Sequence, residues 1–190
     1  MLLPDILAIG EILIDFIPSK IAPLKDLDSF QKCPGGAPAN FAVGIAKLGL
    51  HSGFIGKVGN DPFGKFLIDF LEKSNVDTRN IIIANEGERT TLAFVYYDEK
   101  LDRDFFFYRN NSADIKLQAQ ELKSDYFVNS KFLHFGSVSL THEPSRSAIF
   151  QAIDYCKKNG GKISFDPNIR LDLWKDEKSL RKILKEALDK

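Results

Sequence analysis

Four groups of polar and glycine residues in this sequence could carry chemistry, and each closely follows a stretch that predicts a β-strand or a β-hairpin. They are Asp15, the Gly35-Gly36 pair with Asn40, Arg109, and the segment Asp-Pro-Asn-Ile-Arg at 166–170. Open α/β sheets bind ligands at the carboxyl ends of their strands. A carboxylate and an amide can bracket hydroxyl groups, and arginine can bind a carboxylate or a pair of hydroxyls. The combination indicates a small polyol or a sugar acid as ligand.

Each group also has a purely structural explanation, which the residues alone leave open. The glycine pair could form an ordinary strand-to-helix turn, and Asp15 could cap a turn. Arg109 could be a solvated hairpin side chain, and segment 166–170 could be a plain turn. His134, inside an apolar stretch, is interpreted as a packed core side chain rather than a base. Side-chain chemistry alone therefore predicts a site for a small polar ligand and no particular reaction.

The first third of the chain alternates strand and helix patterns. Residues 5–18 form one apolar, β-branched run that predicts a buried strand ended by Pro18, and residues 51–59 predict a second, shorter strand. Between them a helix is expected from Ala37, with Gly49 at its carboxyl end. Asp61 and Pro62 predict the start of the next helix. Such alternation is typical of parallel strands joined by helical crossovers.

The middle of the chain interrupts this alternation. Residues 89–109 contain two β-rich runs separated by the charged segment 98–104, which predicts an antiparallel hairpin. Strand 132–140, a helix over 143–161, strand 162–168 and a helix over 176–190 follow. The predicted fold is an α/β sheet layer with a small β extension, built from the continuation of the first strand and the hairpin. Such an extension commonly covers a ligand crevice at the strand ends.

Composition excludes several classes of function. The 26 basic and 26 acidic side chains cancel, so no global field favours nucleic acid or an anionic membrane. The first apolar run contains Glu11 and Asp15 and is too short and too charged for a signal peptide or a membrane span. Two cysteines, Cys33 and Cys156, fit reduced thiols, and we expect a cytoplasmic protein. No Walker P-loop, zinc spacing or Gly-x-Ser-x-Gly motif is present.

Six stretches, in the expected order over about residues 6–175, resemble the ribokinase-like (PfkB) carbohydrate kinases. The first is GGAPANFAVGIAKLG, similar to the first signature of that family, and the others are GEILIDFIP, GKVGNDPFGKFL, FFFYRNNSADIKL, LHFGSVSL and SFDPNIRLDLW. Together they resemble fructokinases most and 2-keto-3-deoxygluconate kinases next. The resemblance implies a ribokinase-like parallel-sheet layer with helices on both faces and a small β-sheet lid. Residues 1–190 would form the N-terminal portion of one such domain, with lid segments at about 14–34 and 89–110.

The resemblance also implies which residues bind the substrate. In this family the glycine pair brings backbone amides to the sugar, the asparagine at the helix start binds hydroxyls, and the aspartate of the first strand binds hydroxyls remote from the phosphorylated one. The matching positions are Asp15, Gly35, Gly36, Asn40, Arg109 and Arg170, with Phe107 and Asn168 as further candidates. Phe107 stands where acid-specific relatives often carry a tyrosine, which favours a neutral sugar.

The activity implied is phosphorylation of a sugar hydroxymethyl group by ATP and Mg²⁺, with fructose first and 2-keto-3-deoxygluconate second. A monovalent cation is a further candidate cofactor. The family's catalytic aspartate lies in a Gly-Ala-Gly-Asp motif, which these residues lack, so no catalytic residue is assigned here and the base and ATP site are expected after Lys190. Residues 1–190 alone should be inactive. Family members often pair through this lid, so the resemblance also implies a homodimer. The alternative is a non-catalytic module that binds a sugar or mediates dimerisation.

Overall fold

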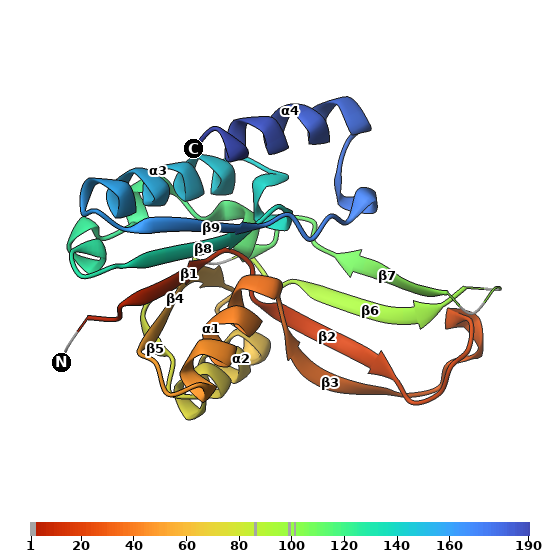
Figure 1. Cartoon of the computed structure of the whole chain (residues 1–190). Helices are drawn as coiled ribbons and strands as arrows, with labels where there is room; N and C mark the ends of the chain where they lie inside the picture. The colour runs from red at the N-terminus through yellow and green to blue at the C-terminus, as the bar shows by residue number, and fades with distance from the viewer. Residues whose placement is uncertain (1–2, 86, 99, 101) are drawn as a thin grey trace.

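Two β-sheets of different kinds organise the chain (Figure 1). The computed structural model describes residues 3–85, 87–98, 100 and 102–190. The main sheet has the order β5-β4-β1-β8-β9, and all its pairings are parallel. Its strands are β1 (Ile6–Ile9), β4 (Ser52–Val58), β5 (Asp77–Ile83), β8 (Phe132–Gly136) and β9 (Lys162–Asp166). The sheet matches the predicted parallel layer.

In the described part of the chain, helices α1 and α2 cover one face of the main sheet, and α3 and α4 cover the other (Figure 1). Their bounds are Ala37–Lys47, Pro62–Lys73, Ser145–Lys158 and Glu177–Leu188; the short 3-10 turns are η1 (Leu24–Asp26), η2 (Ala113–Lys116), η3 (Ala119–Glu121), η4 (Ser124–Phe127), η5 (Val138–Leu140) and η6 (Leu171–Leu173). As predicted, Asp61 caps α2, accepting a hydrogen bond from the Gly64 amide at 2.8 Å. Each face buries its own apolar cluster. These layers confirm the predicted fold class.

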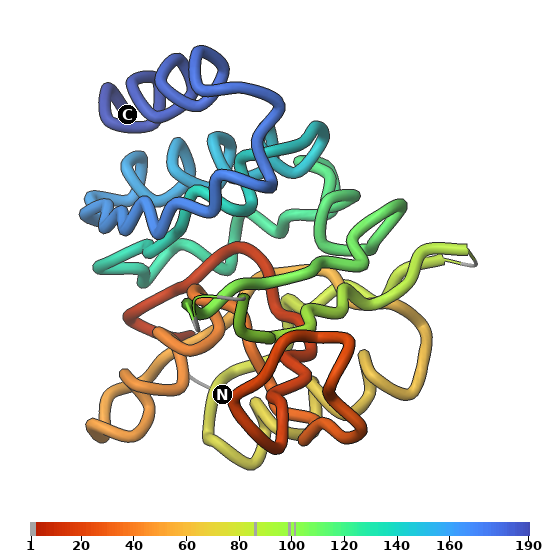
Figure 2. Tube along the Cα trace, turned by 90° about the vertical axis from the view of Figure 1, so that its right-hand side faces the viewer, coloured from red at the N-terminus to blue at the C-terminus, as the bar shows by residue number. Residues whose placement is uncertain are grey.

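The second sheet is a small mixed sheet, called the lid sheet below, with the order β3-β2-β6-β7. Its strands are β2 (Leu13–Pro18), β3 (Phe30–Gly35), β6 (Leu92–Tyr97) and β7 (Arg103–Tyr108). Strands β6 and β7 pair antiparallel, which confirms the predicted hairpin. Residues 99 and 101 of its connection lie outside the described residues. The lid sheet extends from the edge of the main sheet where the parallel strands end (Figures 1 and 2).

The prediction of one continuous strand over residues 5–18 was wrong. The chain leaves the main sheet after β1, where the Gly10 amide still donates to the Ile55 carbonyl at 3.1 Å. It joins the lid sheet in β2, where the Ile14 amide donates to the Thr91 carbonyl at 3.0 Å. Residues 10–12 form the junction between the sheets. The run looks uniform in sequence because both strands bury apolar side chains, although in different sheets.

Two further elements differ from the sequence prediction. Strand β8 stops at Gly136, and the rest of the predicted strand turns into η5, where Leu140 packs in the cluster beneath α3 instead of pairing in the sheet. Strand β5, at the edge of the main sheet, was not predicted. Within the part of the chain that the structure describes, no helix is long and apolar enough to cross a membrane.

Candidate functional site

A polar pocket of about 220 Å³ lies between the lid sheet and the carboxyl edge of the main sheet. Its walls come from the β1–β2 junction, β2, the start of α1, β7, η5 and the loop after β9. The lining residues are Glu11, Leu13, Asp15, Gly36, Ala37, Asn40, Arg103, Phe105, Phe107, Val138, Asn168 and Arg170. Segments far apart in sequence therefore meet at one place, the edge at which parallel sheets bind ligands.

Most residues predicted for the site lie in this pocket. Those that line it are Asp15, Gly36, Asn40, Arg170, Phe107 and Asn168. Gly35 lies directly behind Asp15, and Arg109 does not line the pocket. The lining offers carboxylate, amide and guanidinium groups together, a set that can bind the hydroxyl groups of a small polar ligand.

Asp15 contributes a half-buried carboxylate to the pocket from strand β2. Burial raises the pKa of Asp15 above its ordinary value, while the positive charges of Arg103 and Arg170 act in the opposite direction. The carboxylate thus lies within the field of two guanidinium groups. Such a carboxylate is well suited to accept hydrogen bonds from ligand hydroxyls.

Arg103 and Arg170 both stack on Phe105, although Arg103 comes from strand β7 and Arg170 from the loop after β9. The distance from the guanidinium carbon to the ring centroid is 5.0 Å for Arg103 and 5.3 Å for Arg170. The sequence prediction missed Arg103 and Phe105. Their signal was the two-residue period of strand β7, which puts residues 103, 105 and 107 on one face.

The glycine pair has two separate structural roles. Gly36 is the N-cap of α1 and has a φ of 103°, so the helix begins at the pocket wall with Asn40 near its first turn. Gly35, in β3, pairs with Leu13 of β2, and the Asp15 side chain of β2 leans over it. A Cβ atom at Gly35 would lie 2.3 Å from Oδ2 of Asp15 and 2.7 Å from its Cγ. The missing side chain of Gly35 therefore makes room for the Asp15 carboxylate.

We expect Gly35→Ala to displace the Asp15 carboxylate and to lower the free energy of unfolding by about 1–3 kcal/mol, the usual cost of overpacking. Gly44→Ala in α1 is the control, because a Cβ there meets no atom within 4 Å. The control should stabilise the protein by about 0.5–1 kcal/mol, since alanine favours a helix interior over glycine. Urea unfolding of both variants measures the difference. Equal stability of the two variants would contradict this steric role of Gly35.

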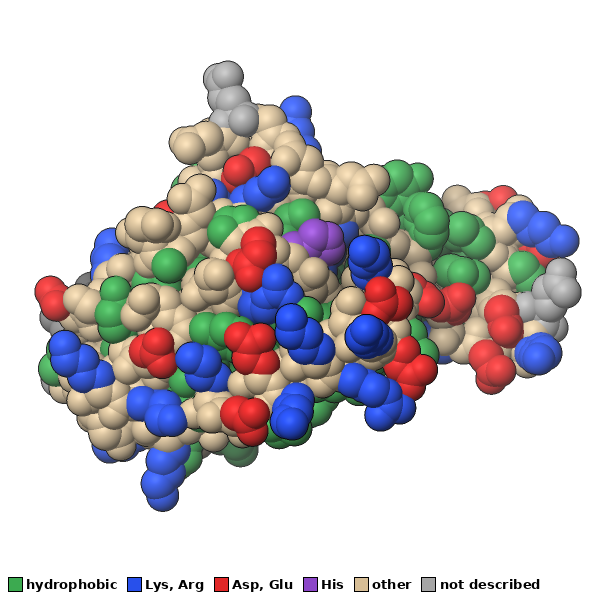
Figure 3. All heavy atoms as spheres, turned by 90° about the horizontal axis from the view of Figure 1, so that it is seen from above, with side chains coloured by type: hydrophobic (Ala, Val, Ile, Leu, Met, Phe, Trp, Pro, Cys, Tyr) green, Lys and Arg blue, Asp and Glu red, His purple; other side chains and the backbone are tan. Residues whose placement is uncertain are grey.

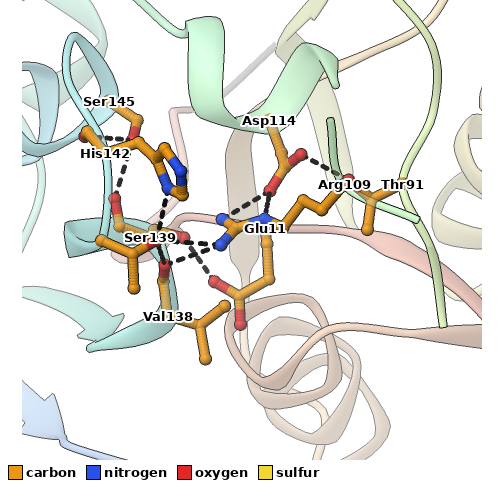
Figure 4. Close-up of polar contacts among 9 residues, drawn as sticks. Glu11, Thr91, Arg109, Asp114, Val138, Ser139, His142 and Ser145 are labelled. Carbon is orange, nitrogen blue, oxygen red and sulfur yellow. Dashed lines mark hydrogen bonds and ion pairs between the residues drawn. The ribbon is translucent and has the colours of Figure 1, made fainter. Parts of the chain in front are cut away.

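Arg109 lies outside the pocket because its guanidinium group is buried in the protein. The residue is 6% exposed. Its Nε donates to Oδ2 of Asp114 at 2.8 Å, and its Nη1 donates to the Val138 carbonyl at 3.2 Å and to Thr141 Oγ1 at 2.9 Å (Figure 4). Thr91 Oγ1 donates to the other oxygen of Asp114 at 2.6 Å. Arg109 therefore connects the base of the lid sheet to η5.

The reason for the different position of Arg109 is that strand β7 ends at Tyr108. Alternation along the strand would put residue 109 on the same face as Phe107, but the backbone turns before it can do so. Asn111 has a φ of 53°, and the following turn η2 places Asp114 beside the guanidinium group. An ion pair formed by this turn cannot be predicted from strand periodicity.

Glu11 is a pocket residue that the sequence prediction missed. It is 2% exposed and lies in the junction between the two sheets. Ser139 Oγ donates a hydrogen bond to Oε2 of Glu11 (Figure 4). Burial raises the pKa of Glu11, while the Ser139 hydrogen bond and the charge of Arg109 act in the opposite direction. The available signal was a carboxylate inside an otherwise apolar run, four positions before Asp15.

His134 is buried as predicted. It is 7% exposed, its ring stacks on Phe41 with centroids 3.9 Å apart, and its Nδ1 lies 2.9 Å from Ser164 Oγ. Among the described residues, no group of three or more histidine, cysteine or acidic side chains is arranged to hold a metal ion. Basic and acidic side chains are interspersed over the face seen in Figure 3.

The family model described as pfkB family carbohydrate kinase matches residues 3–189. A relative named probable fructokinase-6, chloroplastic, from Arabidopsis thaliana is 47% identical over 172 residues, which cover 90% of this chain and 44% of the relative. The chain spans about half the length of the curated relatives it matches.

Solved structures of sugar kinases resemble the chain in fold and sequence. An uncharacterized sugar kinase from Pyrococcus horikoshii in complex with ATP has a TM-score of 0.88 and 42% identity, with 96% of this chain and 59% of that one covered. A fructokinase with bound ATP from Xylella fastidiosa has a TM-score of 0.83 and 34% identity, with 96% and 56% covered.

Proposed function

Because this chain belongs to the pfkB family of carbohydrate kinases, we propose that it forms the sugar pocket and lid of an enzyme that phosphorylates a sugar hydroxymethyl group with ATP. Fructose is the proposed substrate. The observation that carries the proposal is the convergence of Asp15, Asn40 and Arg170 in one pocket beside the lid sheet. These groups can orient a sugar by its hydroxyls, and orientation of the reacting groups supplies a large part of the rate of such transfers.

Two features favour a neutral sugar over 2-keto-3-deoxygluconate. Arg103 and Arg170 are near the Asp15 carboxylate, which offsets their attraction for an acidic substrate. Phe107 lines the pocket with a ring that has no hydroxyl group to bind a carboxylate. The relative from Arabidopsis thaliana and the structure from Xylella fastidiosa both carry the name fructokinase. A non-catalytic sugar-binding module is not favoured.

ATP is proposed as the phosphoryl donor, since two of the similar structures hold it. The described residues do not fit a dedicated Mg²⁺ site, because they contain no cluster of acidic ligands. The 190 residues also lack the Gly-Ala-Gly-Asp motif. The proposal therefore assigns the catalytic base, the nucleotide and its Mg²⁺, and any monovalent cation, to chain outside these residues.

The roles of this chain's own residues follow from their positions. Asp15 would accept hydrogen bonds from the sugar hydroxyls, and the Asn40 amide could both donate hydrogen bonds to them and accept hydrogen bonds from them. The lid sheet, through Phe105 and Phe107, would cover the sugar and exclude water, which otherwise competes with the sugar hydroxyl for the phosphoryl group. With Cys33 and Cys156 both free, we further propose a cytoplasmic location.

The test is ADP release by the full-length gene product with ATP and each of three sugars: fructose, 2-keto-3-deoxygluconate and glucose. We expect turnover with fructose and little with the other two. The polypeptide of residues 1–190, assayed in parallel, should release no ADP with any of the sugars. A preference for 2-keto-3-deoxygluconate would contradict the proposal that fructose is the substrate. Fructose binding by the full-length product without any turnover would support the non-catalytic alternative.

We also propose that the protein forms a homodimer through the lid sheet. Phe106 and Tyr108 are 48% and 59% exposed on β7, and their rings pack edge to face at 5.2 Å. Exposed aromatic rings grouped in this way are typical of protein interfaces.

We expect light scattering to give the mass of a dimer and Phe106→Glu to give that of a monomer, because a charge would be buried at the interface. The matched control is Val128→Glu, which changes a side chain that is 55% exposed and lies between η4 and β8. A monomeric wild-type protein at high micromolar concentration would exclude the dimer.

A further inference from the structure

We propose that Glu11 is a further sugar-binding residue, whose carboxyl group binds one hydroxyl of the substrate from the inner end of the pocket and is oriented by Ser139. This inference rests on the proposed function and extends it to a residue that neither the sequence motifs nor the pocket chemistry above had assigned to the sugar. Glu11 lines the same pocket as Asp15 and Asn40.

The position of Glu11 is unusual for an acidic side chain. It is 2% exposed, whereas glutamates are almost never fully buried unless they have a partner. It belongs to the short junction that connects β1 of the main sheet to β2 of the lid sheet. Its neighbour Ile12 is 1% exposed, so the junction has little freedom to carry Glu11 out to solvent. A buried carboxylate at a ligand pocket is a costly feature that needs a partner or a function.

Ser139 orients the carboxyl group. Its hydroxyl donates to Oε2 of Glu11, and its own carbonyl accepts from Ser145 Oγ at 2.8 Å (Figure 4). The close approach of Ser139 depends on Gly10, because a Cβ atom at that position would lie 2.8 Å from Ser139 Oγ. Three elements, the junction, η5 and α3, therefore cooperate to hold one oxygen of Glu11 in a defined place.

The second oxygen of Glu11 accepts no hydrogen bond from another side chain among the described residues. Within the described residues, the Glu11 carboxylate accepts hydrogen bonds from the Ser139 hydroxyl and from its own backbone amide. Arg109, the nearby cation, directs its guanidinium group to Asp114, Val138 and Thr141 instead (Figure 4). Since Glu11 lines the pocket, this oxygen is available to a ligand. A sugar hydroxyl placed there would add a hydrogen bond to the carboxylate.

The charges around Glu11 favour a hydroxyl group over an anion. Asp114 pairs with Arg109 at 2.7 Å, so the pair offers little net positive charge to attract an anionic ligand to this end of the pocket. A hydroxyl both donates and accepts, and it can therefore pair with Glu11 in either protonation state. Burial raises the pKa of Glu11, so a ligand group that can pair with both the protonated and the ionised carboxyl group suits this position. Arg103, which also lines the pocket, is exposed, whereas Glu11 is buried.

The experiment uses the full-length gene product and its Glu11→Gln and Glu11→Leu variants, with Glu72→Gln on the outer surface of α2 as the matched control. Calorimetry gives the dissociation constant of fructose and of its single-deoxy analogues, and steady-state kinetics gives KM for ATP. We expect Glu11→Leu to weaken fructose binding about ten- to hundredfold, the usual effect of losing a buried hydrogen bond to a charged group. Glu11→Gln keeps a hydrogen-bonding amide and should lose less. KM for ATP should stay unchanged in all variants.

The deoxy analogues give a readout that a merely structural residue would not affect. In the wild-type protein several of them should bind more weakly than fructose. In Glu11→Leu the penalty for one analogue should disappear, because its missing hydroxyl is the partner of Glu11.

Unchanged fructose affinity, or deoxy penalties that all persist in a folded variant, would overturn the role of Glu11. Loss of cooperative unfolding in both Glu11 variants would also overturn it and assign Glu11 a structural role. If the wild-type protein binds none of the sugars, the proposed function itself fails, and that result is distinct from normal binding with an indifferent Glu11.

Discussion

Arg109→Met in the full-length gene product should lower the free energy of unfolding by about 3–5 kcal/mol, the cost of removing one partner from a buried ion pair. The substitution leaves the Asp114 carboxylate, which is 4% exposed, with the Thr91 hydroxyl as its one remaining side-chain partner among the described residues. It also removes the hydrogen bonds from Arg109 to the Val138 carbonyl and to Thr141. The base of the lid sheet would then lose its polar connection to η5.

Urea unfolding with two comparison variants tests this expectation. Arg181→Met on α4 breaks an exposed pair with Glu177, and it should cost no more than about 1 kcal/mol. The double variant Arg109→Met with Asp114→Leu should recover part of the loss, since it leaves no uncompensated charge in the interior. If Arg109→Met costs no more than Arg181→Met, the buried ion pair is not a main stabilising contact of the lid.

Asp15→Ala should reduce kcat/KM for the sugar by a factor that corresponds to a loss of about 1–3 kcal/mol of transition-state stabilisation. This is the typical loss when buried polar partners are left unpaired. Asp15 lies in the pocket on β2, and Gly35 makes room for its carboxylate. Removing the carboxylate also leaves Arg103 and Arg170 without the anion that balances them. KM for ATP should barely move, because the proposal assigns the nucleotide to chain outside these residues.

The control for Asp15 is Asp104→Ala, which removes a carboxylate from the opposite face of β7. Asp104 accepts a hydrogen bond from the Tyr96 hydroxyl at 2.7 Å and does not line the pocket. Its loss should leave the sugar kinetics unchanged. Unchanged sugar kinetics in a folded Asp15→Ala variant would remove Asp15 from the site.

The sequence determined the features that depend on local pattern and backbone chemistry. Asp61 and Pro62 predicted the start of α2, and Gly49 and Gly160, with φ of 82° and 79°, follow α1 and α3 as expected. Alternating strands and helices predicted the parallel sheet. The carboxyl ends of parallel strands share one edge, and for this reason the order of the elements was enough to group Asp15, Asn40 and Asn168 at one site.

The tertiary structure decided which side chains at that edge face the pocket. Strand β7 stops one residue before Arg109, so this arginine turns inward to Asp114 while Arg103 takes the position at the pocket. The apolar run around Glu11 hides a change of sheet, and only that change brings Glu11 to Ser139, 128 positions away. Hydrogen bonds and ion pairs of this kind depend on where distant segments end and turn. Local sequence patterns contain no information on these long-range contacts, because the contacts form only when the two sheets pack together.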